Sequence, residues 1–168
     1  LFVNNLRNFL LGGNEDGTAG FSGALAALKI YDSPLTEEQI QSGYTKGINN
    51  NLLVYADAKS LDDDEKVNWP NHGAVLDKLT AEANLEVTDV SGKIAVVLAD
   101  GNKLLLGDEM VKQLNFSKPF TAVLSLLSTA GAKTDFFFGH GNKAVRMVGT
   151  GKWQQIICSY YQGKLQVH

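Results

Sequence analysis

Short runs of alternating apolar and polar residues extend through most of this chain, and this two-residue period predicts β-strands with one buried face. Gly, Asn, Asp and Ser separate the runs and mark turns. Many short strands at roughly regular spacing indicate an antiparallel β-sandwich. The pattern predicts strands at 9–11, 23–31, 52–56, 85–90, 93–98, 104–106, 120–127, 134–138, 144–148, 153–161 and 164–167, with a helical turn at 109–114.

The stretch 23–31, GALAALKIY, is one of the longest of these strands. Its alanines would also allow a helix, but the glycine at its start and its β-branched and aromatic end favour a strand. With a strict two-residue period, the even-numbered residues from Ala24 to Ile30 share one face. The odd-numbered residues from Leu25 to Tyr31 then share the other.

Two local signals predict further elements. Thr36, followed three residues later by Gln39, forms a capping box, which predicts a short helix over about 36–44. Ser91-Gly92 separates two predicted strands by the length of a tight hairpin turn. The sequence therefore predicts one short helix and at least one hairpin.

Composition sets the size and class of the protein. The chain has 168 residues, of which 44% are hydrophobic and 20% charged, as in an ordinary globular domain. This length suits one sandwich domain. The net charge of −3 gives no general attraction toward phosphate backbones, so nucleic acid is not an expected partner.

Cys158 is the single cysteine, which excludes an internal disulfide and a multi-cysteine zinc site. We expect it to face the core, alongside Ile156 and Tyr160. The longest apolar stretches, such as 122–127, have the length of strands, so no helical membrane span is expected. The chain begins at Leu1 without the pattern of a secretion signal, and it reads as an excised or processed piece.

One segment near the start of the chain carries a family motif. The segment 21–40 reads FSGALAALKIYDSPLTEEQI and resembles the closing motif of the laminin-G-like, concanavalin A-like jelly-roll family. In that motif Phe-x-Gly opens the last strand, Ile-Tyr ends it, and a Leu-(Ser/Thr)-x-Glu-x-Ile helical turn follows. The matching residues are Phe21, Gly23, Ile30, Tyr31, Leu35, Thr36, Glu38 and Ile40.

Two other stretches resemble parts of the same family that normally come earlier. They are the strand start 118–121, KPFT, and the strand 151–160, GKWQQIICSY. Joining His168 to Leu1 would restore the family's usual order. The resemblance then covers nearly the whole chain, in circularly permuted order.

Two domain organisations fit this permuted order. One is a single jelly-roll domain over 1–168, with a closing half at 1–47 and an opening half at 52–168. The other is a pair of half-domains that strand exchange between chains completes. The single permuted domain predicts that residues 1–3 continue the path of the strand 164–167 within the same chain.

Catalysis is not expected from these residues. A sandwich glycosidase needs two carboxylates flanking the scissile bond, and the Glu-x-Asp-x-(x)-Glu strand pattern of jelly-roll glycosidases is missing. Glu86 and Asp89 have the wrong spacing to share a strand face. We therefore expect a non-enzymatic protein, with a glycoside hydrolase as a distant alternative.

Trp69, Asn71 and His72 are the candidate ligand-binding residues, in the sequence WPNHG. Trp69 could stack on a sugar while Asn71 and His72 hydrogen-bond its hydroxyls. The alternative is that Trp69 is buried and anchors its loop.

Acidic loops supply candidate metal ligands. Asp62, Asp63 and Asp64 could offer oxygen atoms to calcium, and so could Asn14 and Asp16. The first loop lacks the spacing of a calcium-binding loop. The alternative for both is a solvated turn, formed at Asn14 and Asp16 by their own side chains.

The prediction from the sequence is an all-β antiparallel jelly-roll sandwich with one short helix. The family resemblance implies a non-catalytic carbohydrate-binding module of an extracellular or cell-surface bacterial protein, with calcium as the cofactor to test. The alternative is a structural or protein-adhesion module without a glycan ligand. The expected partner is a glycan or a surface protein, and a strand-swapped assembly stays open.

Overall fold

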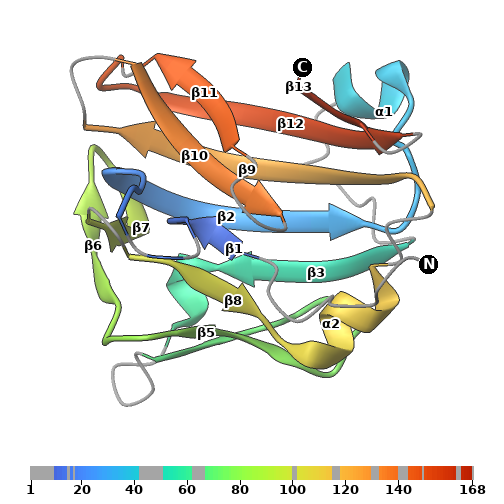
Figure 1. The fold of residues 1–168 in the computed structure, drawn as a ribbon, viewed down its shortest axis with the longest axis horizontal. Helices are drawn as coiled ribbons and strands as arrows, with labels where there is room; N and C mark the ends of the chain where they lie inside the picture. Colours follow the sequence, from blue (N-terminus) through green and yellow to red (C-terminus); the bar gives the residue numbers. More distant parts are fainter. Residues whose placement is uncertain are drawn as a thin grey trace.

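The computed structural model shows two antiparallel β-sheets packed as a sandwich, and the helices among the described residues are short (Figure 1). The predicted all-β sandwich is confirmed. The structure describes residues 10–14, 16, 18–41, 51–61, 67–99, 102–114, 118–129, 133–139, 144–148, 150–161 and 164–167.

Each sheet is a continuous ladder of hydrogen-bonded strands. The six-stranded sheet has the order β11 (Ala144–Val148), β10 (Lys133–Gly139), β1 (Leu10–Gly12), β8 (Leu104–Leu106), β5 (Lys78–Ala81) and β4 (Asn68–Pro70). The seven-stranded sheet follows β13 (Lys164–Val167), β12 (Trp153–Tyr161), β9 (Phe120–Ser128), β2 (Gly23–Tyr31), β7 (Lys93–Leu98) and β6 (Glu86–Val90). Its seventh strand, β3 (Leu52–Asp57), pairs with the second half of β2.

Strands from the early part of the chain lie inside both sheets. β1 pairs with β10 on one edge and with β8 on the other. β2 pairs with β9 along one edge, and β7 and β3 share its other edge (Figure 1). One strand of 10–31 thus lies inside each sheet, between strands of 52–167, and the two parts of the chain bury one common core. The predicted contact between 1–3 and 164–167 falls outside the described residues.

The core between the sheets consists of large apolar side chains with little polar content. Trp69, Phe21, Phe136 and Phe138 are among its largest fully buried side chains. The rings of Phe21 and Phe136 meet edge to face, with centroids 5.2 Å apart and an interplanar angle of 78°. Such aromatic pairs add to the stabilisation that comes from burying their area.

A β-bulge in β2 changes which of its residues face the core. Leu25 pairs with Leu126 of β9, but the next aligned residue is Ala27, so Ala26 is an extra residue in the ladder. The bulge interrupts the two-residue period, and Leu25 joins Leu28 and Ile30 in the core. Ala24 and Ala26 lie in another cluster, so the predicted division of β2 into even and odd faces is wrong at Ala26 and on its N-terminal side.

The local signals in the sequence are confirmed. The Thr36 hydroxyl accepts a hydrogen bond from Gln39 N–H at 3.1 Å, and the Gln39 side chain accepts one from Thr36 N–H at 2.8 Å. The helix α1 that follows is Glu37–Gln41, and the predicted extension to 44 lies outside the described residues. Ser91 and Gly92 join β6 to β7 with φ angles of 51° and 82°, as a type I′ hairpin turn requires.

Short elements without a clear period were missed by the sequence pattern. They are β4, β5 and the 3₁₀ turn η1 (Ala58–Ser60). Pro70 ends β4, which the sheet accommodates because β4 is an edge strand. The helical turn expected at 109–114 is the helix α2 (Asp108–Gln113). Within the described ranges, no helix is long and apolar enough to cross a membrane.

The bulge predicts a difference between neighbouring substitutions. Leu25→Ala should lower the free energy of unfolding by about 2–5 kcal/mol, because it removes a fully buried side chain from the core. Ala27→Ser, on the opposite face and partly exposed, should change it by less than about 1 kcal/mol. Urea denaturation measures both. Equal effects would contradict the register described here.

Candidate functional site

Trp69 packs in the interior of the sandwich. It lies in β4, its side chain is 0% exposed, and its indole N–H donates a 3.0 Å hydrogen bond to the carbonyl of Asp57. A ring buried on both faces offers no surface for a sugar. The predicted stacking role of Trp69 is therefore corrected to a packing role.

The side-chain amide of Asn71 holds its loop against the free edge of β3. Its Oδ1 accepts hydrogen bonds from the N–H groups of Tyr55, at 2.6 Å, and Gly73, at 2.9 Å. Its Nδ2 donates to the carbonyls of Leu53, at 3.0 Å, and Val75, at 2.7 Å. These four bonds use the hydrogen-bonding capacity of the amide. Backbone N–H groups of His72, Ala74 and Val75 also donate to carbonyls of β3. The Asn71 amide therefore helps to pair this loop with the edge of β3 opposite β2, a structural role in place of the predicted ligand role.

His72 is exposed and lies beside the aromatic ring of Tyr55. The two rings meet edge to face with centroids 6.2 Å apart. The ammonium of Lys29 lies 4.8 Å from the centroid of the Tyr55 ring, and the Tyr55 hydroxyl donates to Asp57 at 3.0 Å. Burial lowers the pKa of Lys29, while the charge of Asp57 opposes that shift. The imidazole of His72 is exposed, so solvent or a ligand can reach it.

Asn14 and Asp16 hold the turn between β1 and β2. Asn14 is 6% exposed, its Nδ2 donates to the Thr18 hydroxyl at 3.0 Å, and its Oδ1 accepts from Ala19 N–H at 3.0 Å. Asp16 accepts hydrogen bonds from the hydroxyl and N–H of Thr18, and chiefly the hydroxyl bond lowers the pKa of Asp16. These contacts describe a turn closed by its own side chains.

The candidate metal residues do not converge in the part of the chain that the structure describes. No group of three or more His, Cys, Asp or Glu side chains in that part could hold a metal ion. Asp62, Asp63 and Asp64 lie outside the described residues, and their predicted role stays a prediction.

Cys158 faces the core from β12, as expected. Its side chain is 0% exposed, and burial raises the pKa of the thiol to about 12. A thiol that stays protonated at neutral pH is a poor nucleophile and a poor metal ligand. The residue acts as a small apolar side chain.

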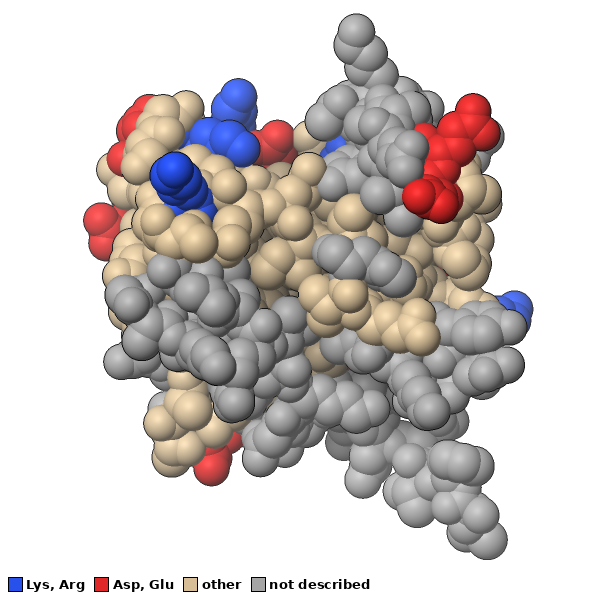
Figure 2. Space-filling model, turned by 90° about the horizontal axis from the view of Figure 1, so that it is seen from above, with Lys and Arg blue, Asp and Glu red and all other residues tan. Residues whose placement is uncertain are grey.

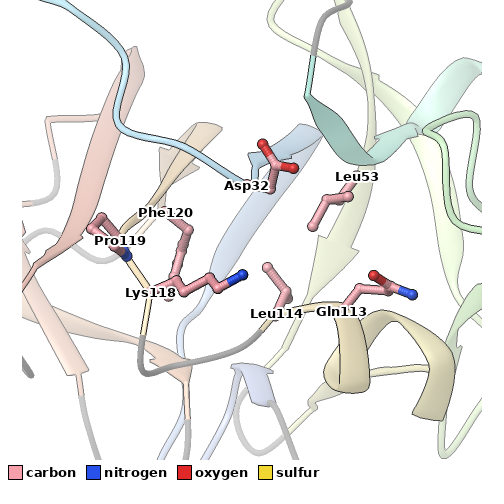
Figure 3. Close-up of a pocket in the computed structure, with 7 residues that line it drawn as sticks. All are labelled: Asp32, Leu53, Gln113, Leu114, Lys118, Pro119 and Phe120. Carbon is pink, nitrogen blue, oxygen red and sulfur yellow. The ribbon is translucent and has the colours of Figure 1, made fainter.

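A cleft opens at one end of the sandwich, where four elements meet. Seven of the described residues line this end cleft, and its volume is about 180 Å³. In Figure 3, Lys118, Leu114 and Gln113 follow one another along one side, with Asp32 and Leu53 opposite them. Asp32 follows β2, and Leu53 lies in β3. Gln113 ends α2, and Leu114 is its C-cap. Lys118 and Pro119 precede β9, which begins at Phe120.

The lining of the end cleft combines an apolar floor with exposed polar groups. Leu114 and Phe120 are 2% and 3% exposed and belong to the core. Asp32, Gln113 and Lys118 are exposed and supply a carboxylate, an amide and an ammonium. Such a mixture of apolar surface with a few polar groups is typical of small-ligand sites. Among its described lining residues, Asp32 is the single carboxylate.

A second hollow adjoins the end cleft. It has a volume of about 400 Å³, and we call it the α2 hollow. Its lining residues are Leu53, Ala74, Val75, Leu76, Glu109 and Gln113. Leu53 and Gln113 line both spaces, so the end cleft and the α2 hollow are neighbours. No motif pointed to the lining residues of the α2 hollow, because they come from segments far apart in sequence and have no regular spacing.

The surface charge of the described residues is mixed. On the face shown in Figure 2, basic and acidic side chains lie near the margin, and at one corner they lie close together. The described part of that face therefore shows no broad basic area of the kind that binds nucleic acids.

No protein-family model, no curated protein and no solved structure matches the chain. The resemblance in 21–40 thus remains a likeness between short motifs. What the structure supports on its own is the antiparallel β-sandwich. We therefore infer function from the geometry of the end cleft and the α2 hollow.

Asn71→Ala tests the structural role of the amide. The substitution leaves two N–H groups and two carbonyls without their partner, so the free energy of unfolding should fall by about 2–3 kcal/mol. The neighbouring variant His72→Ala should change it by less than about 0.5 kcal/mol, because that side chain is exposed. Denaturant unfolding compares them. An Asn71→Ala variant with an unchanged free energy of unfolding would contradict the structural role of the amide.

Burial of Cys158 predicts its reactivity. Iodoacetamide at mildly alkaline pH should label Cys158 only after unfolding, since the folded thiol is enclosed and its pKa is raised to about 12. The unfolded thiol ionises near 9.0, so the free energy of unfolding should fall as pH rises from there toward 12. This fall should be less steep in Cys158→Ala. Mass spectrometry that finds rapid labelling of the folded protein would contradict the prediction.

Proposed function

We propose that this protein is a non-catalytic, laminin-G-like jelly-roll module that binds a carbohydrate in the end cleft. The observation that carries the proposal is the meeting of Asp32, Gln113 and Lys118 around an apolar floor. The motif resemblance in 21–40 supports the same class of protein. It also supports an extracellular or cell-surface location in a bacterium.

The chemistry of the lining suits a polyhydroxylated ring. The Asp32 carboxylate accepts hydrogen bonds from hydroxyl groups, the Lys118 ammonium donates them, and the Gln113 amide does both. Leu53 and Pro119, which are partly exposed, provide apolar contact for the C–H groups of the ring above the buried floor. The volume of about 180 Å³ is below the roughly 300–1,000 Å³ of pockets for larger ligands and favours one small ring.

Neither hydrolysis nor calcium is part of the proposal. A glycosidase needs two carboxylates about the scissile bond, and the described lining supplies one. Asn14 and Asp16 use their side chains within a turn.

A protein-adhesion module is the second candidate function. One observation favours it: the side chain of Leu76 is 97% exposed on the surface. Together with the neighbouring Ala74 and Val75, Leu76 forms a small apolar surface that a partner protein can contact.

A glycan array, with and without calcium, tests the proposed function. We expect the folded protein to bind at least one glycan. Asp32→Asn and Lys118→Gln should each weaken that binding about tenfold or more, because each removes a charged hydrogen-bonding group from the cleft. The control Glu86→Gln changes an exposed carboxylate on β6, away from the cleft, and should bind normally. An array without signal, or signals unchanged in both cleft variants, would reject the proposal.

A further inference from the structure

The end cleft and the α2 hollow lie next to each other. They share Leu53 and Gln113 in their linings, so a ligand bound in the cleft beside Gln113 lies next to the hollow. The cleft, at about 180 Å³, has room for one small ring, whereas the hollow is larger, at about 400 Å³. Two adjoining spaces of this kind fit a ligand built from linked units.

Most of the lining of the α2 hollow comes from two segments. Ala74, Val75 and Leu76 of loop 71–77 contribute apolar side chains, which we call the apolar wall, and Glu109 and Gln113 of α2 contribute polar ones. A sugar ring has C–H faces and a hydroxyl-bearing edge. The C–H face of a ring can therefore contact the apolar wall while its hydroxyl groups form hydrogen bonds with Glu109 and Gln113.

Polar contacts at both ends fix the apolar wall. At one end, Asn71 holds the loop to β3, and Ala74 N–H donates to the Leu52 carbonyl at 2.9 Å. At the other end, the Asp77 carboxylate accepts hydrogen bonds from Glu109 N–H at 2.9 Å and Met110 N–H at 3.2 Å.

Asp77 thus caps α2 from a distant segment, since Gly107 at the N-cap makes no side-chain cap. A Cβ at Gly107 would lie 2.1 Å from that carboxylate, so the capping contact needs glycine there. Binding would not have to order this wall, which reduces the entropic cost of association.

Resting on the proposed function, we propose that the end cleft and the α2 hollow are consecutive subsites for a linear oligosaccharide. The first ring lies in the cleft between Asp32 and Lys118. The second lies in the hollow with its C–H face against Leu76. Gln113 contacts both rings at their junction. The exposed side chain of Leu76 is then the part of the second subsite that the ligand covers.

Titration calorimetry with four named series tests this inference. The probes are the mono-, di- and trisaccharides of α-1,4-linked glucose, β-1,4-linked glucose, β-1,4-linked mannose and β-1,4-linked N-acetylglucosamine. In at least one series the disaccharide should bind about tenfold more tightly than the monosaccharide. Leu76→Ser should remove that gain. The control Val167→Ser replaces another exposed apolar side chain, 51% exposed on β13, and should keep the gain.

The outcomes separate the inference from the proposed function. Monosaccharide binding that depends on Asp32, without a gain for the disaccharide or with a gain that survives Leu76→Ser, would overturn the two-subsite inference and leave the function in place. No binding of any probe would overturn both. Because Leu76 is 97% exposed, Leu76→Ser should fold normally, and circular dichroism checks this.

Discussion

Hydrogen bonding along both edges of β2 is the constraint on which the rest of the structure depends. β9 occupies one edge, and β7 and β3 divide the other. This places Leu25, Leu28 and Ile30 in the core between the two sheets. The end of β2 brings Asp32 to the rim, close to the start of β9. The end cleft is therefore a consequence of this central pairing.

Asn71 and Trp69 stabilise the fold, and a sequence pattern cannot distinguish this role from ligand binding. Asn71 has the residue type and the loop setting of a sugar ligand, yet its amide completes the edge of β3. Trp69 has the ring that a sugar would need, but the ring is buried and its N–H is bonded to a carbonyl. Both roles depend on partners more than ten residues away in sequence.

The elements that sequence predicts well are those with short-range causes. The Thr36–Gln39 capping box and the Ser91-Gly92 turn each depend on neighbouring residues, and both are confirmed. The bulge at Ala26 was not predicted, because it reflects how β2 aligns with β9 rather than any preference of alanine. The end cleft was not predicted either, since its lining joins segments as distant as Asp32 and Lys118.

The same logic explains why the rim is the place for a binding site in this sandwich. Between the sheets, side chains such as Phe21 and Phe136 fill the space, and a polar group there would need a partner to offset its burial. At the rim, strands end and polar side chains remain hydrated, while the floor still belongs to the core through Leu114 and Phe120. Apolar contact and hydrogen bonding can then act on one ligand without disturbing the packed interior. Because Asn71 and Asp77 hold the adjoining loop through separate bonds, changes to its exposed tip can alter recognition while the fold is kept.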